Sequence, residues 1–204
     1  MKPDLWTAES KMNVSPLCGV DEAGRGPLAG PVCAAAVILP AGIRIEGLND
    51  SKKLSEKKRE ELYVVITSIA PAFGVAFASV AEIEELNILN ATYLAMNRAI
   101  EMLSIRPALC LIDGNTAKGV RHPNICVPGG DAACASIAAA SVLAKVTRDR
   151  HMREAAGLYP AYSFEKHKGY GTVLHYEAIR EHGVCAIHRP SFLKSMSRTN
   201  GRKT

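Results

Sequence analysis

The sequence predicts an α/β fold, and three observations support this prediction. Short, continuous apolar runs recur along the chain, as is typical of buried strands. Longer segments between them carry apolar residues at three- and four-residue spacing, as is typical of helices that pack on a sheet. Two apolar runs lead directly into acidic residues and then a glycine. We therefore expect strand ends to carry the functional site.

The first predicted strand leads into two adjacent acids. Residues 17–20 form an apolar run, and Asp21 and Glu22 follow it before a glycine-punctuated turn at residues 23–26. Like charges at the end of a buried strand cost free energy unless a cation or hydrogen-bond donors meet them. Because successive strand side chains point to opposite faces, both acids can share one ligand only if the backbone swivels between or just after them. The alternative is a strand-to-turn junction with solvated acids.

A second strand and a basic loop follow. Residues 32–39 form a continuous run of small apolar residues, which predicts a central strand beside the first. The polar loop at residues 48–54 carries Lys52 and Lys53 and precedes a predicted helix at residues 55–70. Positive charge is unfavourable near a helix start because of the helix dipole, so the two lysines indicate an anionic partner.

The middle of the chain is interpreted as scaffold. Residues 72–79 resemble a strand, and residues 79–82 form a capping box that opens a short helix. A longer helix starts at Asn87 or Asn90 and continues to about residue 103, with most of its apolar residues predicted to face inward.

Two further aspartates follow short strands. Residues 108–112 form an apolar run that ends in Asp113 and a glycine, which repeats the pattern of the first strand. A strand at residues 125–127 leads to Asp131, which opens an alanine-rich helix from residue 132 to about residue 155. An ordinary Asp-Gly turn and a helix N-cap are the alternative explanations for these two acids.

Cations and aromatic rings interleave toward the C-terminus. Lys145 and Arg148 are spaced to present positive charge on the distal half of the long helix. Tyr170 lies between two glycines, just before a final helix at residues 172–181. Rings interleaved with cations are typical of nucleic-acid surfaces. Burial in the core explains the aromatic residues at 159–164 nearly as well, but Tyr170 is harder to bury between glycines.

Composition limits the class of protein. The chain has 204 residues, with 48% hydrophobic and 22% charged, as in a globular protein of one domain or slightly more. It contains no apolar stretch long enough to span a membrane and no secretory signal, so we expect a cytoplasmic protein. We also expect a monomer. None of the six cysteines forms a Cys-x-x-Cys pair, and we expect buried free thiols.

Positive charge is clustered along the chain. Of the formal net charge of +5, the last fourteen residues contribute +4. Elsewhere two clusters stand out: Lys52, Lys53, Lys57, Lys58 and Arg59, and Lys145, Arg148, Arg150 and Arg153. Basic groups beside an acidic centre suit a protein that handles phosphodiesters, although solvated helix faces explain either cluster equally well by itself.

Four acids are candidates for a metal site. They are Asp21, Glu22, Asp113 and Asp131. Carboxylates without histidine suit Mg²⁺ or Mn²⁺ rather than zinc, and two such ions can promote an in-line phosphoryl displacement by water. The sequence shows no nucleophilic Ser or Cys triad and no Gly-Lys-Ser/Thr phosphate loop, so hydrolysis with one or two divalent ions is the favoured chemistry.

The sequence closely resembles the ribonuclease HII family over residues 17–193. The resemblance is carried by segments 19–31 (GVDEAGRGPLAGP), 48–54 (LNDSKKL), 113–114 (DG), 130–131 (GD), 136–141 (SIAAAS), 144–149 (AKVTRD) and 167–172 (HKGYGT). It implies a ribonuclease H-like α/β fold with a mixed central sheet. It also implies an endonuclease that cuts the RNA strand of RNA/DNA hybrids and incises beside ribonucleotides embedded in duplex DNA, leaving a 3′-hydroxyl and a 5′-phosphate.

The resemblance also implies residue roles. The four acids named above would be the catalytic, metal-holding group. Gly24, Arg25 and Gly26 would read the ribonucleotide 2′-hydroxyl through backbone atoms, and Tyr170 would pack against the neighbouring deoxyribose. The 2′-hydroxyl is what distinguishes RNA from DNA, and glycine backbone can approach it closely. Lys52, Lys53 and Lys145 are our candidates for phosphate contacts.

One departure and two alternatives qualify these expectations. The family often has Lys-Gly-Asp where this chain has Gly129-Gly130-Asp131, so no cationic contact is expected there. A metal-dependent DNA nuclease would share the carboxylates but would not need the Gly-Arg-Gly turn beside Tyr170. A non-catalytic hybrid-binding module would keep the cations and lose the metal.

We divide the chain into four parts. They are a variable N-terminal segment (1–16), a ribonuclease H-like catalytic domain (17–158), a C-terminal helical region that binds substrate (159–193) and a basic tail (194–204).

Overall fold

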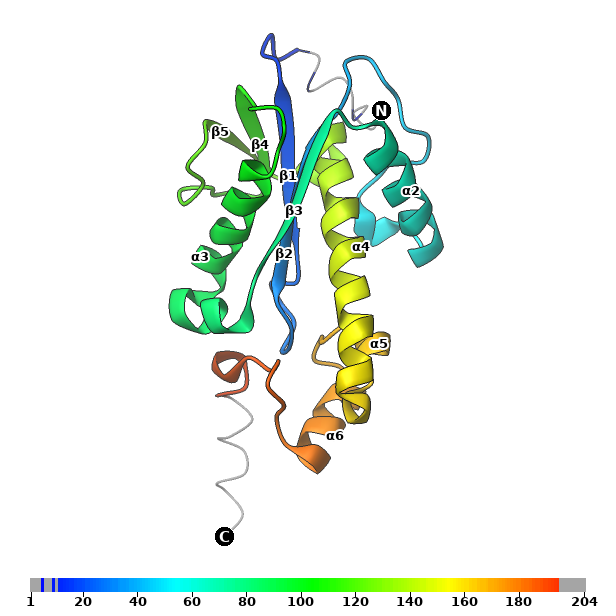
Figure 1. The fold of residues 1–204 in the computed structure, drawn as a ribbon, viewed down its shortest axis with the longest axis vertical. Helices are drawn as coiled ribbons and strands as arrows, with labels where there is room; N and C mark the ends of the chain where they lie inside the picture. Colours follow the sequence, from blue (N-terminus) through cyan, green and yellow to red (C-terminus); the bar gives the residue numbers. More distant parts are fainter. Residues whose placement is uncertain (1–4, 6–8, 10, 195–204) are drawn as a thin grey trace.

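The protein is a central β-sheet with helices on both faces (Figure 1). The computed structural model describes residues 5, 9 and 11–194. Its strands are β1 (Leu17–Ala23), β2 (Val32–Ile38), β3 (Ala72–Ala78), β4 (Leu109–Asp113) and β5 (Asn124–Val127). Its α-helices are α2 (Glu56–Ile69), α3 (Val80–Glu101), α4 (Ala135–Leu158), α5 (Phe164–His167) and α6 (Val173–His182). Short 3₁₀ turns are η1 (Ser51–Lys53), η2 (Gly130–Ala132), η3 (Pro160–Tyr162) and η4 (Pro190–Phe192).

The sheet is mixed, as expected, and its strands lie in the order β3-β2-β1-β4-β5. Strand β1 is central, pairing antiparallel with β2 and parallel with β4. Strand β3 extends the antiparallel side, and β5 extends the parallel side. Because β1 and β4 are parallel neighbours, Asp113 at the carboxyl end of β4 lies close to the acidic part of β1.

The two faces of the sheet build two separate cores. Cys18 and Val20 of β1 pack with helix α3 on one face. Ala35 and Val37 of β2 pack with helices α2 and α4 on the other. This alternation is the period of two that strands impose. On the α2–α4 face, the α4 side chains that pack on the sheet are largely alanine, which lets α4 approach the sheet closely.

Helix α4 approaches strand β1 very closely at Gly19. A Cβ atom at Gly19 would lie 2.1 Å from the carbonyl carbon of Ser136, near the start of α4. The N-terminal segment also meets this point, since Glu9 accepts hydrogen bonds from the Ser136 amide at 2.8 Å and its hydroxyl at 2.6 Å. The start of α4 is therefore held directly against β1, two residues before Asp21.

Most predicted elements are confirmed to within one or two residues. The capping box is present, because the Ser79 hydroxyl accepts from the Glu82 amide and the Glu82 carboxylate accepts from the Ser79 amide. A helix break at Asn87 is confirmed as well: α3 has non-helical backbone there, with φ 67° and ψ 164°. The Asn87 side chain caps the continuing helix by accepting from the amides of Leu89 and Asn90.

Two boundaries were predicted wrongly. Strand β1 does not stop at Val20 but continues through both acids to Ala23. Helix α4 begins at Ala135, with Cys134 at its N-cap, so Asp131 lies in the preceding 3₁₀ turn and does not cap the helix. In both cases backbone pairing and turn geometry, which hydrophobic pattern does not report, decide the boundary.

The C-terminal region is built around buried rings. Phe164 is fully buried and stacks on Tyr162, with ring centroids 5.4 Å apart. His167, His175 and His188 surround these two rings, and all three histidines are at most 8% exposed. The rings at 159–164 therefore follow the alternative interpretation, burial in the core. Tyr170 remains 43% exposed, as expected.

These histidines make stability depend on acid pH. Burial lowers the pKa of His175 to about 4, so the folded protein binds fewer protons than the unfolded chain between pH 4 and 6.5. The contribution of neutral His175 to the free energy of unfolding is therefore complete above pH 6.5. It is lost as the pH drops toward 4, by up to about 3 kcal/mol. Urea unfolding at pH 7.5, 6.0 and 5.0 measures this loss. We expect a smaller loss in His175→Gln than in His122→Gln; equal losses in the two variants would contradict this assignment.

Two of the four expected parts lie largely or partly outside the described residues. Of the basic tail (194–204) only residue 194 is described, and of the N-terminal segment (1–16) residues 5, 9 and 11–16 are described. Among residues 5, 9 and 11–194, no helix combines the length and apolarity needed to cross a bilayer. All six cysteines are free, and four of them are buried.

Candidate active site

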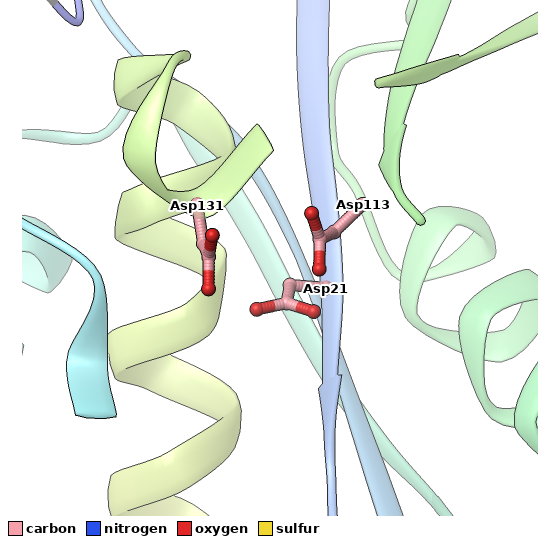
Figure 2. A group of neighbouring side chains, drawn as sticks. All are labelled: Asp21, Asp113 and Asp131. Carbon is pink, nitrogen blue, oxygen red and sulfur yellow. The ribbon is translucent and has the colours of Figure 1, made fainter. Parts of the chain in front are cut away.

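Three aspartates from separate segments converge at one place. Asp21 comes from β1, Asp113 from the carboxyl end of β4, and Asp131 from η2, just before α4. Their carboxylates point toward one another (Figure 2). Each offers an oxygen atom that lies within 4.8 Å of an oxygen atom from each of the others. The close contact of α4 with β1 and the parallel pairing of β1 with β4 bring these segments together.

Glu22 lies outside this group of three. Strand β1 stays regular through the acids, with Asp21 opposite Ala35 and Glu22 opposite Ala34 on β2. The backbone therefore does not swivel between the two acids, and regular alternation turns Asp21 and Glu22 to opposite faces of the sheet. The two carboxyl groups still interact, because the charge of Glu22 raises the pKa of Asp21. The Glu22 carboxylate instead accepts from Arg25 at 3.3 Å.

Local hydrogen bonds orient the three aspartates. Asp113 accepts from the Gly130 amide at 2.7 Å, which ties the end of β4 to the turn that carries Asp131. Asp21 accepts from the Glu22 amide at 2.7 Å. The Lys52 ammonium donates to the Asp131 carboxylate at 3.3 Å. Each carboxylate is thus held in place by a contact from its own surroundings.

The electrostatics of the cluster favour a bound cation. Burial raises the pKa of Asp21 well above its usual value, and the charges of Glu22 and Asp113 raise it further. Burial and the charge of Asp113 also raise the pKa of Asp131, against the opposing effect of Lys52. Raised carboxyl pKa values mean that the negative charges are not fully compensated by the protein. The donor set consists of oxygen alone, which fits a divalent cation of the Mg²⁺ or Mn²⁺ type.

The Gly24-Arg25-Gly26 turn lies next to Tyr170. Gly24 has φ +97°, and a Cβ there would lie 1.9 Å from Arg148 Nε, so only glycine fits. A Cβ at Gly26 would lie 3.9 Å from the Tyr170 ring, which places the turn and the ring in contact range. Lys145 Nζ lies 5.8 Å from the centroid of the same ring. Residues from three distant segments therefore lie next to one another around the Tyr170 ring.

The three candidate lysines all have carboxylate partners. Lys53 pairs with Asp50 at 3.4 Å, and Lys145 pairs with Asp149 at 2.7 Å. The side chains of Lys52 and Lys53 are 74% and 61% exposed, so their partners leave them open to solvent. Burial lowers the pKa of Lys145.

Two buried arginines near the turn were not found from the sequence. Arg148 was expected on a cationic surface, and this was wrong: it is 1% exposed and donates to the carbonyl oxygens of Pro31, Lys168 and Ala29. Arg189 is fully buried and donates to the carbonyl oxygens of Gly24, Arg25 and Gly30. The burial of Arg189, a single arginine in a loop, cannot be predicted from the residue pattern, because the groups that it binds are backbone carbonyls.

Comparison with known proteins decides the family. A family model described as Ribonuclease HII matches residues 18–195. The chain belongs to the ribonuclease HII family. A ribonuclease HII from Marinomonas sp. (strain MWYL1) is 59% identical over 181 residues, covering 86% of this chain and 89% of that protein. One from Endomicrobium trichonymphae is 56% identical over 178 residues, covering 87% and 85%.

Solved structures agree with this assignment. The ribonuclease H2 from Pyrococcus horikoshii OT3 superposes with a TM-score of 0.74 at 25% identity, covering 92% of this chain and 99% of that one. Bst-RNase HIII in complex with Mn²⁺ superposes with a TM-score of 0.73 at 19% identity, covering 96% and 73%, and shows the shared fold. As a member of this family, the protein is a ribonuclease H, an enzyme class that acts on RNA/DNA hybrids.

Proposed function

We propose that the enzyme hydrolyses the RNA strand of hybrids and also incises 5′ to single ribonucleotides embedded in duplex DNA, leaving 3′-hydroxyl and 5′-phosphate ends. One observation carries the proposal: the aspartate cluster adjoins a backbone turn suited to detecting one sugar hydroxyl. Asp21 and Gly24 are three residues apart on one segment, and the turn contacts Tyr170. Cleavage chemistry and sugar recognition are thus adjacent on the same strand and turn.

We assign the metal-holding role to Asp21, Asp113 and Asp131, and we propose that Glu22, whose charge raises the pKa of Asp21, completes the catalytic group. When bound, one or two Mg²⁺ or Mn²⁺ ions would supply the Lewis acidity that in-line hydrolysis of a phosphodiester needs. The protein's own contribution is to hold the carboxylates rigidly, through the Gly130 amide at Asp113 and the Glu22 amide at Asp21. Preorganised groups of this kind need no rearrangement during the reaction.

Substrate recognition is assigned to the surrounding residues. We propose that backbone atoms of Gly24, Arg25 and Gly26 contact the 2′-hydroxyl, and that the exposed Tyr170 ring packs on the next deoxyribose. Because residues 159–193 supply this ring, we propose that the C-terminal helical region binds substrate. Lys52, Lys53 and Lys145 are proposed to contact phosphates, and the exposure of their side chains, 74%, 61% and 22%, supports this.

Defined duplexes test the proposal. Three labelled substrates would be incubated with Mg²⁺ or Mn²⁺: a DNA duplex with one ribonucleotide, the same duplex without it, and a full RNA/DNA hybrid. We expect cleavage of the first and third only, with a product end at the 5′ side of the ribonucleotide. Equal cleavage of the all-DNA duplex would favour a DNA nuclease, and binding without cleavage would favour a hybrid-binding module.

A further inference from the structure

The segment after helix α6 makes unusual contacts with the Gly24–Gly26 turn. Arg189 donates from Nη1 to the Arg25 carbonyl at 2.9 Å and from Nη2 to the Gly24 carbonyl at 2.7 Å. Its Nε and Nη2 also donate to the Gly30 carbonyl, at 2.9 and 2.7 Å. A fully buried guanidinium is costly unless its donors are satisfied, and here one loop satisfies them. Arg189 therefore fixes the two carbonyl groups on either side of Arg25 Cα.

The preceding residue, His188, begins a hydrogen-bond relay to Tyr170. The Cys185 amide donates to His188 Nδ1 at 2.8 Å, and an amide N–H can only donate. The Cys185 carbonyl lies farther from the same atom, at 3.3 Å, so Nδ1 accepts and the His188 proton lies on Nε2. His188 Nε2 lies 3.1 Å from His175 Nε2, which must then accept. The His175 proton is consequently on Nδ1, which donates to the Tyr170 carbonyl at 2.9 Å. Each contact in the relay dictates the tautomer of the next ring.

Burial supports this assignment of neutral tautomers. His175 is fully buried and His188 is 3% exposed. Burial lowers the pKa of both rings. Two protonated rings would place N–H donors face to face at 3.1 Å, so the relay exists only in the neutral form.

Backbone pairing locks the same dipeptide to the loop after the turn. The Arg189 amide donates to the Leu28 carbonyl, and the Gly30 amide donates to the Ile187 carbonyl, each at 2.8 Å. His188 forms an isolated antiparallel bridge with Ala29. The backbone of the dipeptide is thus held in register with residues 28–30, while its two side chains are buried. The other buried arginine, Arg148, binds the carbonyls of Ala29, Pro31 and Lys168, outside the turn.

We propose that the His188–Arg189 dipeptide is a positioning element that sets the spacing between the 2′-hydroxyl-reading turn and the Tyr170 ring, and thereby sets selectivity for a ribonucleotide followed by a deoxyribonucleotide. This proposal rests on the proposed function. Arg189 holds one side of the sugar site, and His188, acting through His175, holds the other. Because the two residues are adjacent in the chain, both sides of the site move together.

The test measures the ratio of two affinities, that for a duplex with one ribonucleotide divided by that for the same all-DNA duplex. Binding of a duplex with one ribonucleotide and of the same all-DNA duplex would be measured with Ca²⁺ as the divalent ion, after confirming that the duplexes stay intact. In the wild type we expect the ribonucleotide to strengthen binding about tenfold or more. Arg189→Lys and His188→Leu should reduce this ratio at least about fivefold and leave the affinity for all-DNA duplex within about twofold. His188→Gln, which keeps a donor near the Nε2 position, should restore part of the ratio.

Two controls separate positioning from general damage. Arg98→Lys removes another guanidinium, the one that pairs with Glu82 and donates to the Phe77 carbonyl, and should leave the ratio unchanged. A merely structural role of Arg189 would weaken binding of both duplexes equally and lower the melting temperature in parallel. Folded Arg189→Lys and His188→Leu variants that keep the wild-type ratio would overturn the proposal. A wild-type protein that binds the two duplexes equally well and does not cleave at the ribonucleotide would instead overturn the proposed function.

A measurement without mutation covers the case in which the variants do not fold. Nitrogen chemical shifts of ¹⁵N-histidine in the wild-type protein at neutral pH report which ring nitrogen carries the proton. We expect the Nε2–H tautomer for His188 and the Nδ1–H tautomer for His175. The opposite tautomer at either ring would break the relay and refute the positioning role of His188.

Discussion

Replacing Asp113 by asparagine is expected to abolish hydrolysis, with a loss of at least about 10²-fold in turnover. The asparagine carbonyl can still accept from the Gly130 amide, so the turn that carries Asp131 keeps its position. One negative charge is lost from a site that needs several to hold a divalent cation. Turnover on the single-ribonucleotide duplex, together with its binding affinity, measures the effect, and we expect affinity to fall only slightly.

The same substitution should stabilise the protein in metal-free buffer. The Asp113 charge raises the pKa of Asp21 and Asp131, so removing it relieves repulsion within a buried group. A gain on the order of 1 kcal/mol corresponds to about 2 to 4 °C in melting temperature for a chain of this size. Glu101→Gln, which removes a half-exposed carboxylate paired with Arg121, serves as the matched control and should change neither turnover nor stability appreciably. Retained turnover in Asp113→Asn would refute its assignment.

Replacing Gly19 by alanine is expected to cause the largest loss of stability. Its Cβ would lie 2.1 Å from the Ser136 carbonyl carbon, and a clash with backbone cannot be relieved by rotating a side chain. Helix α4 must then move away from β1, at a cost of about 3 kcal/mol or more. Thermal unfolding should show a fall of roughly 6 to 12 °C.

Gly157→Ala is the matched control for this prediction. Gly157 lies in helix α4, and a Cβ there meets nothing within 4 Å. Alanine favours the helix over glycine by up to about 1 kcal/mol, so this variant should be as stable as the wild type or more so. If Gly19→Ala unfolded at the same temperature as Gly157→Ala, the close contact between α4 and β1 would be disproved.

The hydrophobic pattern predicted the helices and strands well, because the spacing of apolar residues depends directly on which faces of an element are buried. The strands around Ala35 and Cys110 are continuous apolar runs and were found where expected. The end of β1 was missed because Asp21 and Glu22 interrupt its apolar run, and only pairing with β2 shows that the strand continues through both acids. The same pairing explains why Asp21 and Glu22 diverge.

The acids of the candidate site were visible in the sequence because each follows an apolar run or opens a turn. The residues that hold the neighbouring turn were not. Arg189 and Arg148 bind backbone carbonyls, and any residue can supply a carbonyl, so no residue pattern marks their partners. The three buried histidines were missed for a related reason, since their partners include one another, backbone atoms and aromatic rings that lie together only in the folded region.

Titration of the metal-free enzyme with Mn²⁺, followed by calorimetry, tests most directly whether Asp21, Asp113 and Asp131 form a divalent cation site. We predict saturable binding to the wild type and to Glu101→Gln, and loss of that binding in Asp113→Asn. Binding of Mn²⁺ to Asp113→Asn with the wild-type affinity and stoichiometry would show that the aspartate cluster is not the metal site.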